Sequence, residues 1–165
     1  MKIDLAVIEY LHVNCVRNYA IHNAIQDFFN NIASENNFWR VVQNSTFDIA
    51  VIDWCKLFGS AKETTHWKNN GVSGILDFDE QILSLASIKT EEWKTTWKEI
   101  NDYRNKNAAH IDFDDLSRVV PYVGRAIDIS FISFDVFATQ NHIVGKDIRS
   151  EYELQYRLTL KEITS

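Results

Sequence analysis

Residues that end helices are scarce in this chain. Its 165 residues include one proline, Pro121, and five glycines, and residues 1–58 and 75–120 contain neither. Hairpin-rich and doubly wound folds need turn residues about every ten to twenty positions, because glycine, Asn and Asp enter positive φ at low cost and proline presets turns. The two uninterrupted spans therefore predict an all-α fold, a bundle with long antiparallel helices.

Apolar residues at steps of three and four indicate where the helices lie. We expect helices over residues 8–32, 38–58, 79–88, 90–110, 127–138 and 147–162. Residues 127–131 also alternate as a strand does, and we prefer the helix because the apolar stripe continues to residue 138. Residues 59–77 contain three of the five glycines and should form a connecting loop, which at this length is often functional.

Helix ends are expected at three positions. Gly59 suits the position that follows a helix, and Pro121 suits the first position of a later one. Thr90 suits an N-cap, and Glu91 and Glu92 then lie in the first turn, where their charge complements the helix dipole.

The composition is that of a folded, acidic domain. Hydrophobic residues make up 45% of the chain, which is enough for a sizeable core, and the length suits one domain over residues 1–165. The net charge is −6, so any contact with nucleic acid must be made by a local patch. We find no recognisable signal peptide and no apolar run near the ~18 residues of a membrane span, and we expect a cytoplasmic protein. Cys15 and Cys55 lack metal-site spacing, and we expect buried free thiols.

Familiar catalytic signatures are missing from the sequence. It has no phosphate-binding glycine loop, no nucleophile elbow, no HExxH motif and no calcium loop. His12 and His22 share a helical face but lie ~15 Å apart at ~1.5 Å per residue, too far to bind one metal. His66 falls in the expected loop, and there we expect a solvated side chain.

A metal hydrolase is one alternative. It would use His66 or His110 with Asp112 and Asp114 as ligands. Turn and capping chemistry explains the two aspartates more simply, so we expect no metal or other cofactor.

Residues 102–112 combine a fixed positive charge, amides and an imidazole at the end of a helix. The candidate site residues are Tyr103, Arg104, Asn105, Lys106, His110 and Asp112. An Arg can hold a phosphodiester oxygen through two hydrogen bonds, and a histidine whose pKa lies near neutrality can take the proton from an attacking hydroxyl. An ordinary helix C-terminus, where basic residues complement the dipole, is the simpler alternative.

Arg104 and His110 do not share a face of an ideal helix. Their separation corresponds to ~240° of rotation and ~9 Å of rise, whereas Tyr103, Lys106 and His110 align. A joint site therefore requires Arg104 to bend round, the helix to deform near Asn107, or a symmetry mate to supply the other half.

Arg104, Asn105 and His110 resemble the signature of HEPN domains, in which an Arg followed by a polar residue precedes a His by a short spacer. The spacer here is five residues long. The fuller context, Tyr-Arg-Asn-Lys-x-x-Ala-His-x-Asp, is similar to helical HEPN-like proteins of bacterial toxin and abortive-infection systems. Residues 54–60 and 65–67 look like segments of the same group.

The resemblance implies an all-α bundle that dimerises, so that two Arg–His motifs line a basic cleft and cleave RNA without a metal. His110 would act as general base or acid, and Arg104 would stabilise the scissile phosphate. The products would be a 2′,3′-cyclic phosphate and a 5′-hydroxyl. The residues expected to bind or orient the substrate are Asn105, Lys106, Tyr103 and Asp112.

The partners that follow from the resemblance are an RNA substrate, a second copy of the chain and an antitoxin protein, with no membrane. The alternative function is a noncatalytic HEPN-like module that binds protein or RNA. In that case Trp93 and Trp97 would form the partner interface.

Overall fold

The computed structural model describes residues 4–30, 37–69, 78–108 and 120–165. These residues form helices and turns, with no strand among them, so the all-α fold class is confirmed. The elements are α1 (Leu5–Asn30), α2 (Asn37–Phe58), α3 (Phe78–Leu85), α4 (Thr90–Tyr103), the π-helical segment η2 (Arg104–Ala108), α5 (Gly124–Gln140) and α6 (Ile148–Thr164). Within the described part of the chain, no helix combines the length and the apolar character needed to cross a membrane.

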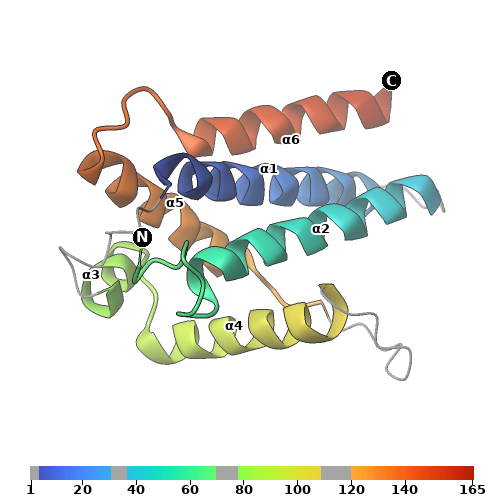
Figure 1. Cartoon of the computed structure of the whole chain (residues 1–165). Helices are drawn as coiled ribbons and strands as arrows, with labels where there is room; N and C mark the ends of the chain where they lie inside the picture. The colour runs from blue at the N-terminus through green and yellow to red at the C-terminus, as the bar shows by residue number, and fades with distance from the viewer. Residues whose placement is uncertain (1–3, 31–36, 70–77, 109–119) are drawn as a thin grey trace.

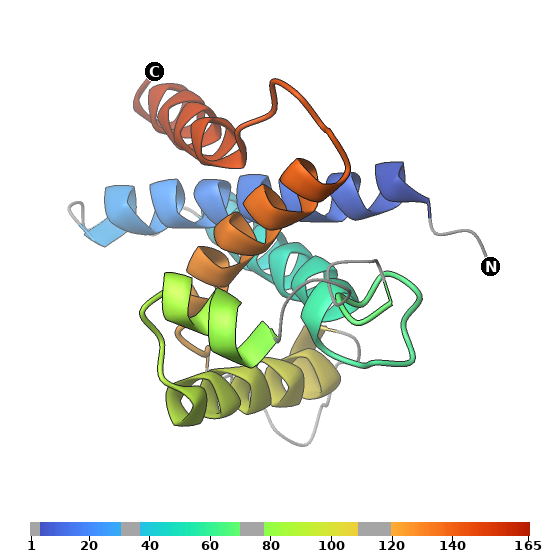
Figure 2. The ribbon, with the colours of Figure 1, turned by 90° about the vertical axis from the view of Figure 1, so that its left-hand side faces the viewer.

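Four helices lie side by side in the order α6, α1, α2, α4 (Figure 1). α1 and α2 run antiparallel and pack along their length, and α6 covers the opposite side of α1. α5 crosses α1 and reaches α3 and α4 (Figure 2). The expected long antiparallel helices are therefore present, and α1 packs against α2, α5 and α6.

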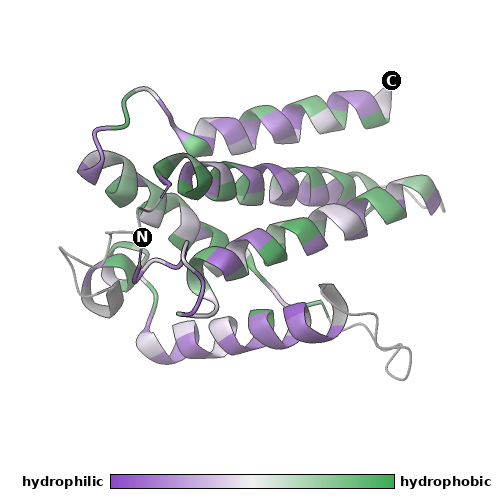
Figure 3. Ribbon diagram, viewed as in Figure 1, coloured by the Kyte–Doolittle hydropathy of each residue, from purple (hydrophilic) through white to green (hydrophobic). Residues whose placement is uncertain are grey.

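The core is built mainly from α1, α2 and α5. Its largest fully buried side chains include Trp54 and Phe58 on α2 and Phe134 and Phe137 on α5. α4 contributes Trp93 and Ile100, whereas most of its ribbon is polar (Figure 3). This helix therefore packs along a narrow stripe and leaves a broad polar surface.

Most expected helix positions are confirmed, with ends that shift by a few residues. The helices expected over residues 8–32, 38–58, 79–88, 127–138 and 147–162 correspond to α1, α2, α3, α5 and α6. Asp147 caps α6, because its carboxylate accepts a hydrogen bond from the backbone N–H of Arg149 at 2.9 Å.

Two expected helix starts are wrong. Lys89 occupies the N-cap position of α4 without a side-chain cap, so Thr90 is already helical. α5 begins at Gly124, after Val123, so Pro121 lies outside the helix. A cap contributes only about 1 kcal/mol. Burial of Trp93 and Val123 in the core outweighs it and decides where these helices begin.

Gly59 follows α2 as expected, but the reason is close packing. Among the described glycines only Gly145 has a positive φ. A Cβ on Gly59 would lie 2.6 Å from the carbonyl oxygen of Cys55 and 2.9 Å from Oδ1 of Asn101. The missing side chain therefore lets the backbone after α2 pass against both α2 and α4.

Both cysteines are free and buried, as expected from their spacing. Burial raises the pKa of Cys15 and Cys55, that of Cys55 to about 12. The thiols therefore stay protonated at neutral pH and act as small apolar groups of the core.

A histidine on α1 lies in the core. His12 contacts the rings of Phe58, Phe134 and Phe137, with centroids 5.5–6.3 Å away. Its ring bonds to the backbone of Ser130, and its Nδ1 has no hydrogen-bond partner among the described residues. Burial lowers the pKa of His12 to about 3, because the charged form has no solvation there.

The buried His12 predicts a specific loss of stability in acid. Below pH 6.5 the unfolded chain takes up a proton at this residue, while the folded chain does not until about pH 3. The free energy of unfolding should therefore fall by about 3 kcal/mol between pH 7 and pH 4 through His12 alone. The His12→Leu variant should lack this part of the loss, as measured by urea unfolding at both pH values.

Replacement of the exposed His142 by Asn is the control for His12→Leu, and it should leave the wild-type pH dependence in place. If the His12→Leu variant and the wild type lose equal stability in acid, the buried neutral state of His12 is not the cause of the loss.

Candidate functional site

The helix changes its geometry where the candidate motif begins. α4 ends at Tyr103, and residues Arg104–Ala108 form the π-helical turn η2. Such turns close i→i+5 hydrogen bonds, are rare, and occur frequently at functional sites. A wider turn rotates the side chains that follow it out of the register of an ideal helix. The deformed turn includes Asn107, and deformation near this residue is one of the three ways in which Arg104 and His110 could form a joint site.

Arg104 and Asn105 form a polar pair on the π-helical turn. Nη1 of Arg104 donates to Oδ1 of Asn105 at 3.1 Å. Arg104 is half-buried, and Asn105 and Lys106 are exposed. The guanidinium also lies close enough to Cys55 on α2 to lower the pKa of that thiol, although burial has the larger, opposite effect. The turn therefore presents one partly covered cation, one amide and one exposed ammonium.

Tyr103 packs between α4 and α2. It is 3% exposed, and its hydroxyl donates to Oδ1 of Asp48 at 2.7 Å. Its ring lies edge-on to Phe47, with 5.3 Å between centroids. This position anchors the last turn of α4 directly before Arg104.

The remaining candidate residues, His110 and Asp112, lie outside the described residues, as does Asp114. The structure therefore brings together Arg104, Asn105 and Lys106 on one turn.

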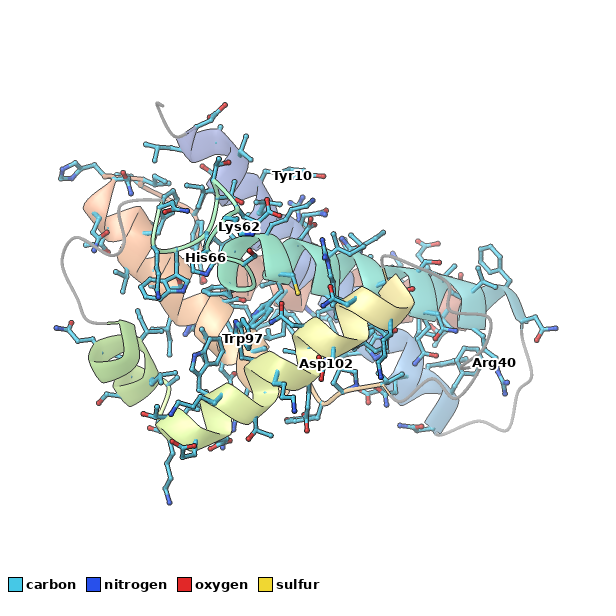
Figure 4. The ribbon with its side chains drawn as sticks, turned by 60° about the horizontal axis from the view of Figure 1, so that its bottom comes forward. Tyr10, Arg40, Lys62, His66, Trp97 and Asp102 are labelled. Carbon is cyan, nitrogen blue, oxygen red and sulfur yellow. The ribbon has the colours of Figure 1, made fainter. Side chains whose placement is uncertain are left out.

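A groove runs between α4 and residues 59–69, and the motif lies at one end of it. Its volume is about 1050 Å³. One wall is α4, and the other is the segment that follows α2; Asn105 belongs to the lining. Figure 4 shows Trp97 and Asp102 on α4 and His66 and Lys62 on the facing segment.

The wall opposite α4 is held in place by hydrogen bonds to the last backbone carbonyl groups of α2. The last carbonyls of a helix have no partner within it. Here the carbonyl of Lys56 accepts from Oγ1 of Thr65 at 3.0 Å, and that of Leu57 accepts from the backbone N–H of Trp67 at 2.8 Å. The segment therefore folds back over the helix end instead of extending into solvent.

His66 is buried in this wall, so the expectation of a solvated side chain is wrong. Its Nδ1 accepts from the backbone N–H of Lys68 at 3.2 Å, and its ring bonds to the carbonyl of Phe58. Burial lowers the pKa of His66, the Phe58 bond opposes this, and the charge of Lys68 adds to it. The ring is thus neutral at pH 7 and carries its proton on Nε2. It serves as a bridge between the segment and α2.

The α4 wall carries lysines and amides at helical spacing. Four of the lining residues, Lys94, Lys98, Asn101 and Asn105, follow one another at steps of four, three and four. This spacing places them on one face of the helix. This stripe is not among the site residues expected from the sequence, and its signal there is the pair of lysines one turn apart beside Trp97.

The groove is more basic than the rest of the chain. Lys68, Lys94 and Lys98 line it, and Asp102 is the one acidic residue of the lining. The chain as a whole has a net charge of −6. Among the described residues, no three or more His, Cys, Asp or Glu side chains lie together as a set of metal ligands would. The groove can therefore hold an anion through ammonium groups and amides.

Comparison with known proteins gave no match to a family model, a curated protein or a solved structure.

The position of Tyr103 predicts a structural role for its hydroxyl. The Tyr103→Phe variant should have a free energy of unfolding lower by about 1–2 kcal/mol, because a hydrogen bond to a carboxylate is lost. Tyr10→Phe is a matched control, since Tyr10 is exposed on α1. Urea unfolding at pH 7 measures both, and equal stability of the two variants would contradict the anchor role.

Proposed function

We propose that this chain is a metal-independent endoribonuclease of HEPN type that acts in a toxin–antitoxin or phage-defence system. The observation that carries the proposal is the π-helical turn at Arg104–Ala108, in which Arg104 is hydrogen-bonded to Asn105, a residue that lines a basic groove. Arginine and an amide at a distorted helical turn are suited to hold a phosphodiester.

In the proposed reaction His110 takes the proton from the ribose 2′-hydroxyl. The oxygen then attacks the adjacent phosphorus, and the bond from phosphorus to the 5′-oxygen breaks. The 5′-oxygen leaves with the proton that His110 took up, so the products are a 2′,3′-cyclic phosphate and a 5′-hydroxyl, and His110 is neutral again. Arg104 stabilises the charge that develops on the phosphate oxygens. General base catalysis and charge stabilisation supply the rate enhancement without a metal ion.

Three neighbours support these two groups in the proposal. Asn105 fixes the Arg104 guanidinium through its side-chain oxygen and orients the substrate. The exposed Lys106 binds a flanking phosphate, and Asp112 orients the imidazole of His110.

The proposed enzyme is a homodimer in which two motifs line one cleft. A second copy, as the resemblance to HEPN domains implies, provides one way to complete the pair of Arg104 and His110. The same cleft is where an antitoxin protein would block the activity.

Cleavage of cellular RNA in excess EDTA tests the ribonuclease. The wild type should cleave, and His110→Ala and Arg104→Ala should be slower by about 100-fold or more, because each removes a group that acts in the transition state. Mapping of the ends should find 2′,3′-cyclic phosphates.

His142→Asn and Arg157→Ala are the matched controls for the cleavage assay, since both side chains are exposed and far along the chain from the motif. They should cleave at the wild-type rate. Circular dichroism must show equal folding. No cleavage by the folded wild type, or full cleavage by His110→Ala, would rule out the proposed mechanism.

The shared cleft predicts that the active species is a dimer. Gel filtration with light scattering should give about twice the mass of one chain at concentrations where RNA is cleaved. A monomer with full ribonuclease activity would contradict the shared site.

The second candidate is a noncatalytic HEPN-like module that binds protein or RNA. It is favoured by Trp97, which is 37% exposed in the groove, because large aromatic side chains are enriched at binding interfaces. A folded protein that binds RNA but never cleaves it would support this function.

A further inference from the structure

We propose that the groove between α4 and residues 59–69 binds single-stranded RNA, with a base stacked on Trp97 and phosphates paired with Lys94 and Lys98. The inference rests on the proposed function for its choice of RNA as the ligand. It assigns substrate binding to residues outside the Arg–His motif and restricts the substrate to unpaired strands.

Trp97 has the properties of a stacking platform. Its Nε1 donates to the carbonyl oxygen of Phe58 at 2.7 Å, and the residue is 37% exposed. The hydrogen bond satisfies the only polar atom of the ring and holds its orientation. The remaining exposed surface is therefore apolar and already ordered, so stacking of a base on it costs little conformational entropy.

The charges beside Trp97 complement a phosphate backbone. Lys94 and Lys98 lie one helical turn apart, before and after the tryptophan. Lys98 has no ion-pair partner among the described residues. Lys94 pairs with Glu91 at 2.9 Å, but both side chains are exposed, and such pairs are weak enough to be exchanged for a phosphate.

The opposite wall adds a second ring and a third cation. Nζ of Lys68 lies 5.2 Å from the centre of the Trp67 ring, and both residues line the groove. Alternation of aromatic rings and cations is how proteins bind single strands without strong sequence preference. A duplex presents its phosphates but hides its base faces, so it could use the lysines and not Trp97.

The groove leads to the proposed catalytic residues. From Lys94 to Asn105 the helix rises by roughly 16 Å, and Asn101 lies between them on the same face. Asn105 bonds to Arg104. A strand that lies along the groove therefore reaches Asn105, the hydrogen-bond partner of the guanidinium that is proposed to hold the scissile phosphate.

Binding should be measured in the His110→Ala background, where the RNA is not cut. The probe is a fluorescently labelled single-stranded RNA of about twelve nucleotides, followed by anisotropy over a range of salt concentrations. The same RNA annealed to its complement is the duplex probe, and polyphosphate is an anion without bases. We expect the single strand to bind at least fivefold more tightly than the duplex.

Two variants separate the two kinds of contact. Lys98→Ala should weaken binding and reduce the salt dependence by about one unit of slope, because one phosphate contact is lost. Trp97→Leu should weaken binding by roughly tenfold and leave the slope unchanged, because stacking releases no counterions. Polyphosphate binding should not respond to Trp97→Leu.

Two variants with the same change in net charge distinguish a local effect on the groove from an effect of net charge. Lys98→Glu should reduce single-strand binding by tenfold or more. Lys161→Glu, on the exposed last turn of α6, makes the same change in net charge and should bind within twofold of the parent.

The groove proposal is overturned by equal affinity for duplex and single strand, by equal effects of Lys98→Glu and Lys161→Glu, or by no binding of single-stranded RNA to the folded protein. If the wild type cleaves RNA but any of these results is found, the ribonuclease proposal stands and the groove proposal fails. If RNA binding depends on the groove residues but the wild type does not cleave RNA, the groove proposal stands and the ribonuclease proposal fails.

Discussion

A buried indole joins three helices of this bundle. Trp54 on α2 donates its Nε1 hydrogen to the carbonyl oxygen of Ala126 on α5 at 3.1 Å, and its ring packs edge-on against Trp93 on α4. An indole N–H left unpaired in the core would cost about 1–3 kcal/mol, so this acceptor restricts where α5 can cross α2. Because the Trp54 ring also packs against Trp93, the same residue helps to set the position of α4. The groove depends on that position.

The core and the groove are linked through the C-terminus of α2. Phe58 packs against Trp54 with its ring and offers its carbonyl to Nε1 of Trp97 and to the ring of His66. One carbonyl that α2 cannot use internally thus holds a residue from each wall of the groove. Gly59 follows directly and leaves room for this close approach. The groove is therefore a consequence of how one helix end is satisfied.

Short-range patterns predicted the helices well and the environment of single residues less well. The apolar spacing located α1, α2, α5 and α6, because that spacing results from the helical repeat itself. Thr90 and Pro121 were misplaced at helix starts, since the small energies of end residues are outweighed by the burial of their neighbours. His66 was expected in solvent, because its polar sequence context gives no sign that the chain folds back over α2.

By itself, the sequence determined the helical class and the presence of an arginine followed by an amide and a lysine at a helix end. These depend on residue type and on spacings of a few positions, which act within one or two turns. The tertiary structure alone decided that Arg104 begins a π-helical turn, that Tyr103 is buried against Asp48, and that lysines and tryptophans from two segments face one groove. These features require contacts between α2, α4 and the segment after α2, and no pattern within a single helix encodes such contacts.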